Sequence, residues 1–197
     1  MSPFRPTRRA GAAALVAAAL MFPSCASPGT ADPVPGPVPL RTFAVTEVDA
    51  DAVVEYDGGE VVTPCFVYRA PDASWTLVPG SVGCSTGVAF GSDMLSMVQV
   101  RAVTARGSIE ELAAQTLADD PDGAVTRLEL AGHDVVRAVT GGEPAIASYV
   151  LAYPDSGLTG GGDPVRAIVL TTMSSAEYEG LVEQIVDTLT RPDGSPL

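Results

Sequence analysis

The stretch from residue 165 to residue 191 reads VRAIVLTTMSSAEYEGLVEQIVDTLTR. Its first part, Val165 to Met173, is apolar and rich in β-branched residues, which predicts a strand. Its second part begins with a capping box at Ser174 to Glu177 and ends before Pro192. Between these limits an apolar stripe recurs at helical spacing, and it consists of Tyr178, Leu181, Val182, Ile185 and Leu189. We therefore predict that a helix from about Ser175 to Thr190 lies on the strand and closes the core.

The preceding chain predicts a second helix and a series of short strands. Ser108-Ile109-Glu110-Glu111 is a capping box, and Pro121 ends the helical pattern that follows it. The predicted strands share β-branched residues and turn-forming boundaries, and they cover residues 42–48, 61–68, 75–78, 88–90, 97–103, 125–131, 135–140 and 146–153. Pro64 restricts the second of these to a sheet edge or a bulge. Strands in runs, without regular alternation with helices, predict an α+β fold in which an antiparallel sheet carries two main helices.

The N-terminus has the layout of a secretory signal peptide. Arg5, Arg8 and Arg9 form a basic start, and the run from Ala10 to Phe22 contains no charge. Such a short apolar run behind basic residues is typical of an exported protein, and it is too short for a membrane-spanning helix. The run ends in Phe22-Pro23-Ser24-Cys25, which resembles a bacterial lipobox. We expect lipidation at Cys25 after removal of residues 1–24; cleavage after Ala26, which would release a secreted protein, is the alternative.

Residues 25–40 form a tether between the lipidated cysteine and the domain. Prolines recur at positions 28, 33, 35, 37 and 39, and this density blocks helix and sheet and favours an extended conformation. A single globular domain is predicted for residues 41–197. From this order we expect the domain to lie on the outer face of the plasma membrane, where the lipid at Cys25 attaches it to the membrane.

The chain contains three cysteines, Cys25, Cys65 and Cys84. An exported protein with an odd number of cysteines needs a use for the unpaired one, and a lipid thioether at Cys25 supplies it. Cys65 and Cys84 can then form a disulfide in an oxidising compartment. This bond would close a loop of about 20 residues and stabilise the fold by roughly 3 kcal/mol.

Charge narrows the possible partners. The chain has 11 basic residues, all of them arginine, against 24 acidic residues, and its net charge is −13. A nucleic-acid-binding protein needs a basic face, so we expect no nucleic-acid partner. Two distant cysteines without a nearby histidine do not match a zinc site, and the acidic clusters at residues 49–60 and 119–122 lack the spacing of a calcium-binding loop. We expect no metal and no cofactor.

One motif could indicate catalysis. Gly83-Cys84-Ser85-Thr86-Gly87 fits the Gly-x-Ser-x-Gly pattern of hydrolases, and His133 is the only histidine. That motif requires a strand, a sharp turn and then a helix, whereas a strand is predicted from Val88 onward. We interpret the motif as a glycine-rich turn and His133 as an exposed residue of the turn Gly132-His133-Asp134. A hydrolase that uses Ser85 and His133 is the alternative to a protein without enzymatic activity.

The order of the elements resembles a known family. Trp75 closes an early strand, residues 97–103 lead into the capped helix at Ser108, a run of strands follows, and an amphipathic helix ends the chain. This is similar to the Mog1/PsbP-like fold over about residues 41–191, and the whole layout is similar to actinobacterial lipoproteins of the LpqN/LpqT type. The resemblance implies a curved antiparallel sheet with helices on both faces. It also implies a binding or accessory role in the cell envelope, with an envelope protein or a small apolar ligand as partner.

Overall fold

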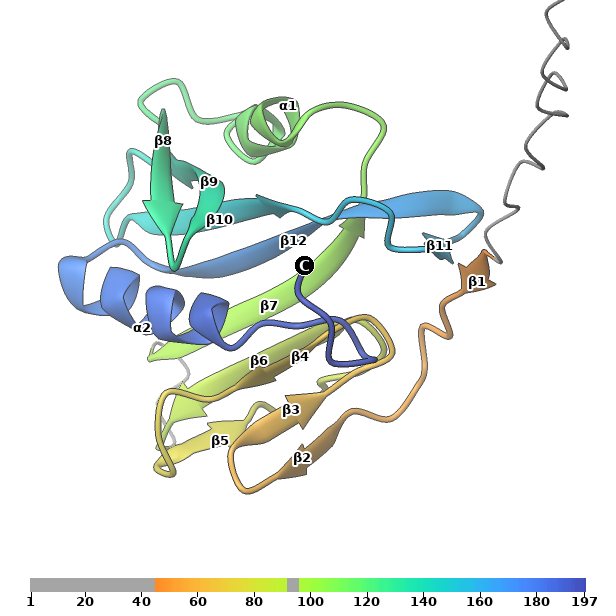
Figure 1. Cartoon of the computed structure of the whole chain (residues 1–197). Coiled ribbons are helices and arrows are strands. Elements are labelled where there is room, and N and C mark those ends of the chain that lie inside the picture. The colour runs from red at the N-terminus through yellow and green to blue at the C-terminus, as the bar shows by residue number, and fades with distance from the viewer. Residues whose placement is uncertain (1–44, 92–95) are drawn as a thin grey trace, which may run out of the picture. The chain divides into compact units, whose positions relative to one another are not determined.

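The computed structural model of the chain describes residues 45–91 and 96–197, so the signal peptide, Cys25 and the tether lie outside the described residues (Figure 1). The larger elements are β6 (Ser85–Phe90), β7 (Met97–Thr104), α1 (Ile109–Gln115), β8 (Ala124–Leu130), β9 (His133–Val139), β10 (Ile146–Ala152), β12 (Asp163–Met173) and α2 (Ala176–Asp187). The smaller strands are β1 (Thr46–Glu47), β2 (Glu55–Asp57), β3 (Glu60–Val62), β4 (Val67–Arg69), β5 (Trp75–Leu77) and β11 (Leu158–Gly160). No helix in this part of the chain is both long and apolar enough to cross a bilayer.

The strands form two sheets. Seven strands of the larger sheet follow the order β5-β6-β7-β12-β10-β9-β8, and β11 and β1 complete its nine strands at the start of β12. Every pairing in it is antiparallel except that of β1 with β11. The smaller sheet has the order β2-β3-β4. The sheet is open, and the predicted α+β class with a mainly antiparallel sheet and two helices is confirmed.

The large sheet has different layers on its two faces. One face carries the main core beneath α2 and the small sheet, with Tyr149, Ile168 and Leu170 among its buried residues. The opposite face carries small buried residues such as Ala138 and Ala167 beneath α1. Alternate residues of β9, β10 and β12 belong to the two cores because successive side chains of a strand point to opposite faces. Figure 1 shows α1 and α2 on these opposite faces.

Capping residues in the sequence position both helices, although the cap of α2 lies one residue later than predicted. Ser108 accepts the Glu111 amide and Glu111 accepts the Ser108 amide, which confirms the first capping box. The helix α2 is capped by Ser175, whose hydroxyl accepts the Tyr178 amide at 3.3 Å, so the box predicted from Ser174 was one residue early. The Ser174 hydroxyl instead accepts a hydrogen bond from Arg137 Nη2 at 3.0 Å.

Two predicted strands differ in the structure. The run from residue 61 to residue 68 is divided between β3 and β4, because the Thr63 hydroxyl bonds both the carbonyl and the amide of Phe66 and turns the chain. The predicted turn at Gly132-His133-Asp134 was also wrong. Ala131 and Gly132 form the turn with positive φ angles of 48° and 80°, which suits a two-residue hairpin. His133 is therefore the first residue of β9, paired with Leu130, and it is half-buried.

Truncation of the α2 stripe tests the closing role of this helix. Ile185 is fully buried in the main core, whereas the adjacent Gln184 is exposed. We expect Ile185→Ala to lower the free energy of unfolding by about 2–5 kcal/mol, because it removes buried methyl groups and leaves a cavity. Gln184→Ala is the matched control and should change it by less than about 0.5 kcal/mol. Urea denaturation measures both, and equal effects would show that α2 does not close the core.

Candidate functional site

The residues of the Gly-x-Ser-x-Gly motif do not meet the histidine. Ser85 begins β6 and pairs with Arg101 of β7, and the chain after it continues as a strand. His133 lies on β9, and β7, β12 and β10 separate the two strands. At a spacing of about 4.8 Å per strand, four steps place Ser85 and His133 about 19 Å apart along the sheet. A nucleophile and its base need hydrogen-bond contact, which this arrangement does not provide.

The predicted disulfide between Cys65 and Cys84 is present. Their Cα atoms are 5.5 Å apart, and Cys65 is fully buried in the main core. Cys65 lies in the turn between β3 and β4, and Cys84 immediately precedes β6, so the bond joins the small sheet to the large one. The Tyr153 hydroxyl donates a 2.6 Å hydrogen bond to the Cys65 carbonyl at the same point. Burial raises the pKa of the Tyr153 phenol, which keeps the donor protonated at neutral pH.

The acidic clusters are used in turns. The Asp49 carboxylate accepts the Asp51 amide at 2.9 Å, and the Asp120 carboxylate accepts the amides of Asp122 at 3.2 Å and Gly141 at 2.8 Å. Among residues 45–91 and 96–197, no three His, Cys, Asp or Glu side chains converge into a group that could hold a metal ion. The carboxylates of Asp49 and Asp120 serve as acceptors for backbone amides.

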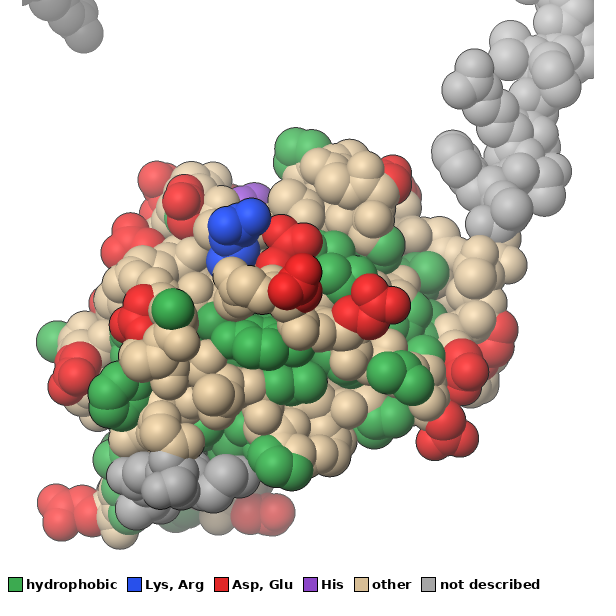
Figure 2. All heavy atoms as spheres, turned by 90° about the horizontal axis from the view of Figure 1, so that it is seen from below, with side chains coloured by type: hydrophobic (Ala, Val, Ile, Leu, Met, Phe, Trp, Pro, Cys, Tyr) green, Lys and Arg blue, Asp and Glu red, His purple; other side chains and the backbone are tan. Residues whose placement is uncertain are grey.

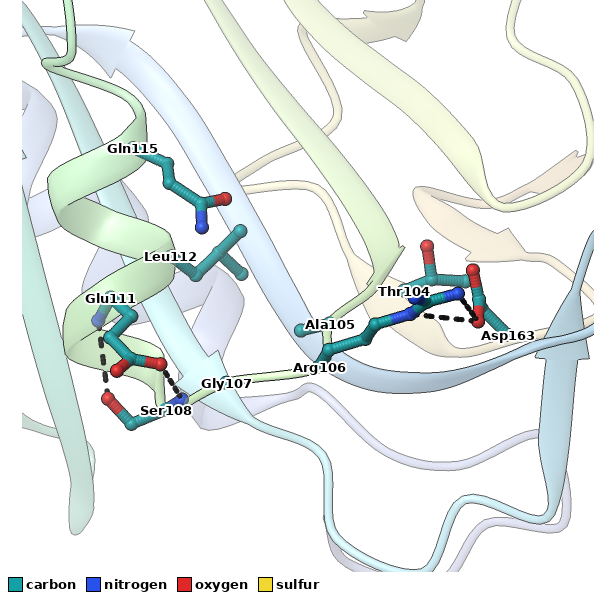
Figure 3. Close-up of a pocket in the computed structure, with 9 residues that line it drawn as sticks. All are labelled: Thr104, Ala105, Arg106, Gly107, Ser108, Glu111, Leu112, Gln115 and Asp163. Atoms are coloured by element: carbon teal, nitrogen blue, oxygen red, sulfur yellow. Dashed lines mark hydrogen bonds and ion pairs between the residues drawn. The ribbon is translucent and has the colours of Figure 1, made fainter.

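A polar cleft of about 300 Å³ lies beside α1 (Figure 3). Figure 3 shows Leu112 and Gln115 of the helix on one side of the cleft, and Arg106 with Asp163 on the other. Both Nε and Nη2 of Arg106 donate to Asp163 Oδ1, at 3.2 and 2.8 Å. The carboxylate of Glu111 is occupied by the capping box. The charged groups of this cleft therefore already have partners within the protein.

A larger pocket, which we call the hairpin pocket, lies beside the hairpin of β11 and β12. Its volume is about 430 Å³, and Val45, residues 155–159 and residues 164–166 line it. Leu158, Pro164 and Val165 supply apolar lining. The Ser156 hydroxyl donates to the Val165 carbonyl at 2.6 Å and accepts the Leu158 amide at 3.2 Å, which holds the loop against β12. This size lies within the range of small-molecule sites, about 300–1,000 Å³.

Arg166 gives the hairpin pocket a free charge. The register between β12 and β7 shifts between Val165 and Ala167, and such an irregularity re-aims a side chain. Within the described part of the chain, the Arg166 guanidinium has no ion pair or hydrogen bond, and its side chain is exposed. Asp155 also lines the pocket, but it does not pair with Arg166. The pocket can therefore offer an apolar wall and an unpaired arginine to one ligand.

Arg191 anchors the loop that borders this pocket. Its Nη1 donates to the Asp155 carbonyl at 3.0 Å and its Nη2 donates to the Pro154 carbonyl at 2.8 Å. Its guanidinium also lies over the Tyr153 ring, 5.4 Å from the centroid. These contacts connect the end of α2 to the residues after β10. The pocket wall is thus fixed by the C-terminal segment as well as by the hairpin.

Comparison with known proteins adds little to this geometry. No family of known proteins matches the chain, and no curated protein matches it. Among solved structures, a crystal structure of a protein from Bacteroides thetaiotaomicron VPI-5482 is similar at 14% identity with a TM-score of 0.41. The similarity covers 69% of this chain and 49% of that chain, so it spans about half of the other protein's length.

The sequence alone did not predict the hairpin pocket. The glycine-rich segment from residue 157 to residue 163 is typical of a flexible hairpin, and Arg166 lies inside the predicted strand Val165 to Met173. The short parallel pairing of Thr46 with Leu158 and of Glu47 with Thr159 joins segments that are far apart in sequence. No local pattern reports such a contact. An arginine within an otherwise apolar strand was the one available signal.

Two buried tyrosines provide a matched test of the hydrogen bond at Cys65. The Tyr149 hydroxyl is buried and has no partner among the described residues, whereas the Tyr153 hydroxyl bonds the Cys65 carbonyl. Tyr153→Phe should lower the free energy of unfolding by about 1–2 kcal/mol, because it leaves a buried carbonyl unpaired. Tyr149→Phe should change it by less than about 0.5 kcal/mol. Thermal and urea denaturation measure both, and an equal loss in the two variants would contradict this assignment.

Proposed function

We propose that this chain is a non-catalytic binding module of the cell envelope, and that the hairpin pocket is its ligand site. The observation that carries the proposal is a pocket of about 430 Å³ whose lining combines apolar residues with an unpaired arginine. A guanidinium binds a carboxylate or a phosphate through parallel hydrogen bonds. The ligand that fits is a small amphiphile, with an apolar body against Leu158 and Val165 and an acidic head at Arg166.

The distribution of polar groups supports binding rather than hydrolysis. The hydrolase alternative requires Ser85 and His133 in contact, and three strands of the sheet lie between them. The polar cleft beside α1 uses its charged side chains in an ion pair and a helix cap. Figure 2 shows a face whose margin carries many acidic side chains, with apolar side chains near its middle and only a small basic group. Arg166 combines an unpaired guanidinium with a position at the hairpin pocket, and this favours an acidic ligand there.

We further propose that the protein acts outside the cytoplasm, attached to the outer face of the plasma membrane by a lipid at Cys25. The basic start, the apolar run and the sequence Phe22-Pro23-Ser24-Cys25 support export and lipidation. The disulfide between Cys65 and Cys84 supports an oxidising compartment. Secretion after cleavage at Ala26 is the competing outcome.

The finer fold assignment is a proposal of the same kind. A helix on each face of a mainly antiparallel sheet, in the chain order described above, supports a Mog1/PsbP-like α/β/α sandwich. It also supports a relation to the actinobacterial lipoproteins whose signal, tether and domain are arranged similarly.

Substitution of Cys25 tests the anchor. We expect the wild-type protein to fractionate with membranes, and Cys25→Ser to appear in the medium, because serine cannot carry the lipid thioether. Immunoblotting of membrane and medium fractions measures the distribution, and Ser24→Ala, which keeps a small residue before the cysteine, is the control. A wild-type protein found free in the medium with Ser27 at its N-terminus would contradict lipidation.

Substitution of Arg166 tests the ligand site. We expect a fluorescent long-chain fatty acid to bind the wild-type protein, and Arg166→Gln to weaken binding by about tenfold to a hundredfold, because a charged hydrogen bond is lost. Arg101→Gln is the matched control, since Arg101 is also exposed and has no ion pair among the described residues. Equal affinity of the wild type and Arg166→Gln, or equal affinity for the corresponding fatty alcohol, would contradict the proposed ligand chemistry.

A further inference from the structure

One edge of the large sheet is long and uncovered. Its last strand, β8, spans seven residues and pairs within the described chain only with β9. The opposite edge strand, β5, has three residues. In the small sheet, the edge strand β4 is covered by the C-terminal segment, since Val67 and Thr190 exchange two backbone hydrogen bonds of 2.9 Å. A long free edge is a template for pairing with another strand.

The hairpin geometry determines which backbone groups of β8 face outward. Leu130 and His133 flank the two-residue turn, so they form a hydrogen-bonded pair. Hydrogen-bonded pairs alternate along an antiparallel ladder, so Leu128 also directs its amide and carbonyl toward β9. The amides and carbonyls of Val125, Arg127 and Glu129 then point away from the sheet. These three residues are exposed.

The sequence of this edge is complementary to itself in one register. We propose that two copies of the chain pair antiparallel through β8, with the two-fold axis at Leu128. In this register, Arg127 of each copy lies opposite Glu129 of the other, and both belong to the set whose backbone groups point outward. The pairing therefore forms two opposite-charge pairs across the strands and uses the free backbone groups.

The neighbouring register is unfavourable. A two-fold axis at Arg127 would place the two Arg127 side chains directly opposite each other, and like charges in that position destabilise a strand pair. The register at Leu128 instead brings the two Leu128 side chains together as a non-hydrogen-bonded pair, in which the side chains are closest. Arg127 already pairs with Glu110 of α1 on the same sheet face, which holds its guanidinium near the edge. A symmetric, self-complementary patch is the ordinary basis of a dimer.

Charge reversal at Arg127 and Glu129 tests the pairing of two β8 strands. The full-length chain is used, purified with any modification that it receives in the cell. Light scattering after size-exclusion chromatography should give a dimer for the wild type. Arg127→Glu and Glu129→Arg should each raise the dissociation constant about tenfold or more, because both cross-strand pairs become repulsive. An equimolar mixture of the two variants should form dimers again, since each then faces its opposite charge. Arg69→Glu, which reverses an exposed and ion-paired arginine elsewhere, should leave the dimer unchanged.

Cysteine cross-linking tests the register. Two Leu128 Cα atoms would be about 4.5 Å apart, which lies within disulfide range. Under a mild oxidant, Leu128→Cys should give a covalent dimer. Thr126→Cys, on the same face of the strand, should not, because its two copies would be offset by about 13 Å. A monomeric wild type, mixed variants that stay monomeric, or cross-linking of both cysteine variants to the same extent would overturn the proposal.

Discussion

The disulfide between Cys65 and Cys84 is the constraint on which the main core depends. The small sheet consists of three strands of three residues each, and strands this short have little stability alone. The bond fixes their turn to the start of β6, and Tyr153 holds the same turn by its hydrogen bond to the Cys65 carbonyl. Phe66, Tyr68 and Val61 are thereby held in the core opposite Ile185 and Leu170. Without the disulfide, this cover of the main core would depend on non-covalent contacts such as the pairing of Val67 with Thr190.

The central strand β12 connects this core to the surfaces proposed to function. It pairs with β7 on one side and β10 on the other, and with β11 at its start. Its middle residues are buried on both faces, since Ile168 belongs to the main core and Val169 to the core beneath α1. Its start carries the bulge at Arg166 and borders the hairpin pocket. A strand with a buried middle thus positions an exposed charge beside the hairpin pocket.

Local signals in the sequence predicted the elements that depend on neighbouring residues. The capped helix at Ser108, the apolar stripe of α2 and the strand from Val165 to Met173 are present, and the disulfide agrees with the count of cysteines. Contacts that join distant segments could not be predicted this way. The β1 and β11 pairing and the unpaired state of Arg166 follow from tertiary packing. The turn lies at Ala131-Gly132 and not at His133. The two positions correspond to adjacent registers of the β8–β9 hairpin, and the amino-acid composition of the turn does not distinguish them.

The stability of the oxidised and reduced chain tests the central claim most directly. Trp75 is the only tryptophan and is buried in the main core, so its fluorescence reports whether the core is intact. Urea denaturation should show one cooperative transition for the oxidised chain, and reduction of the disulfide should lower the free energy of unfolding by about 3 kcal/mol. An unchanged free energy of unfolding after verified reduction would show that the small sheet holds its place without the bond, and would contradict this account.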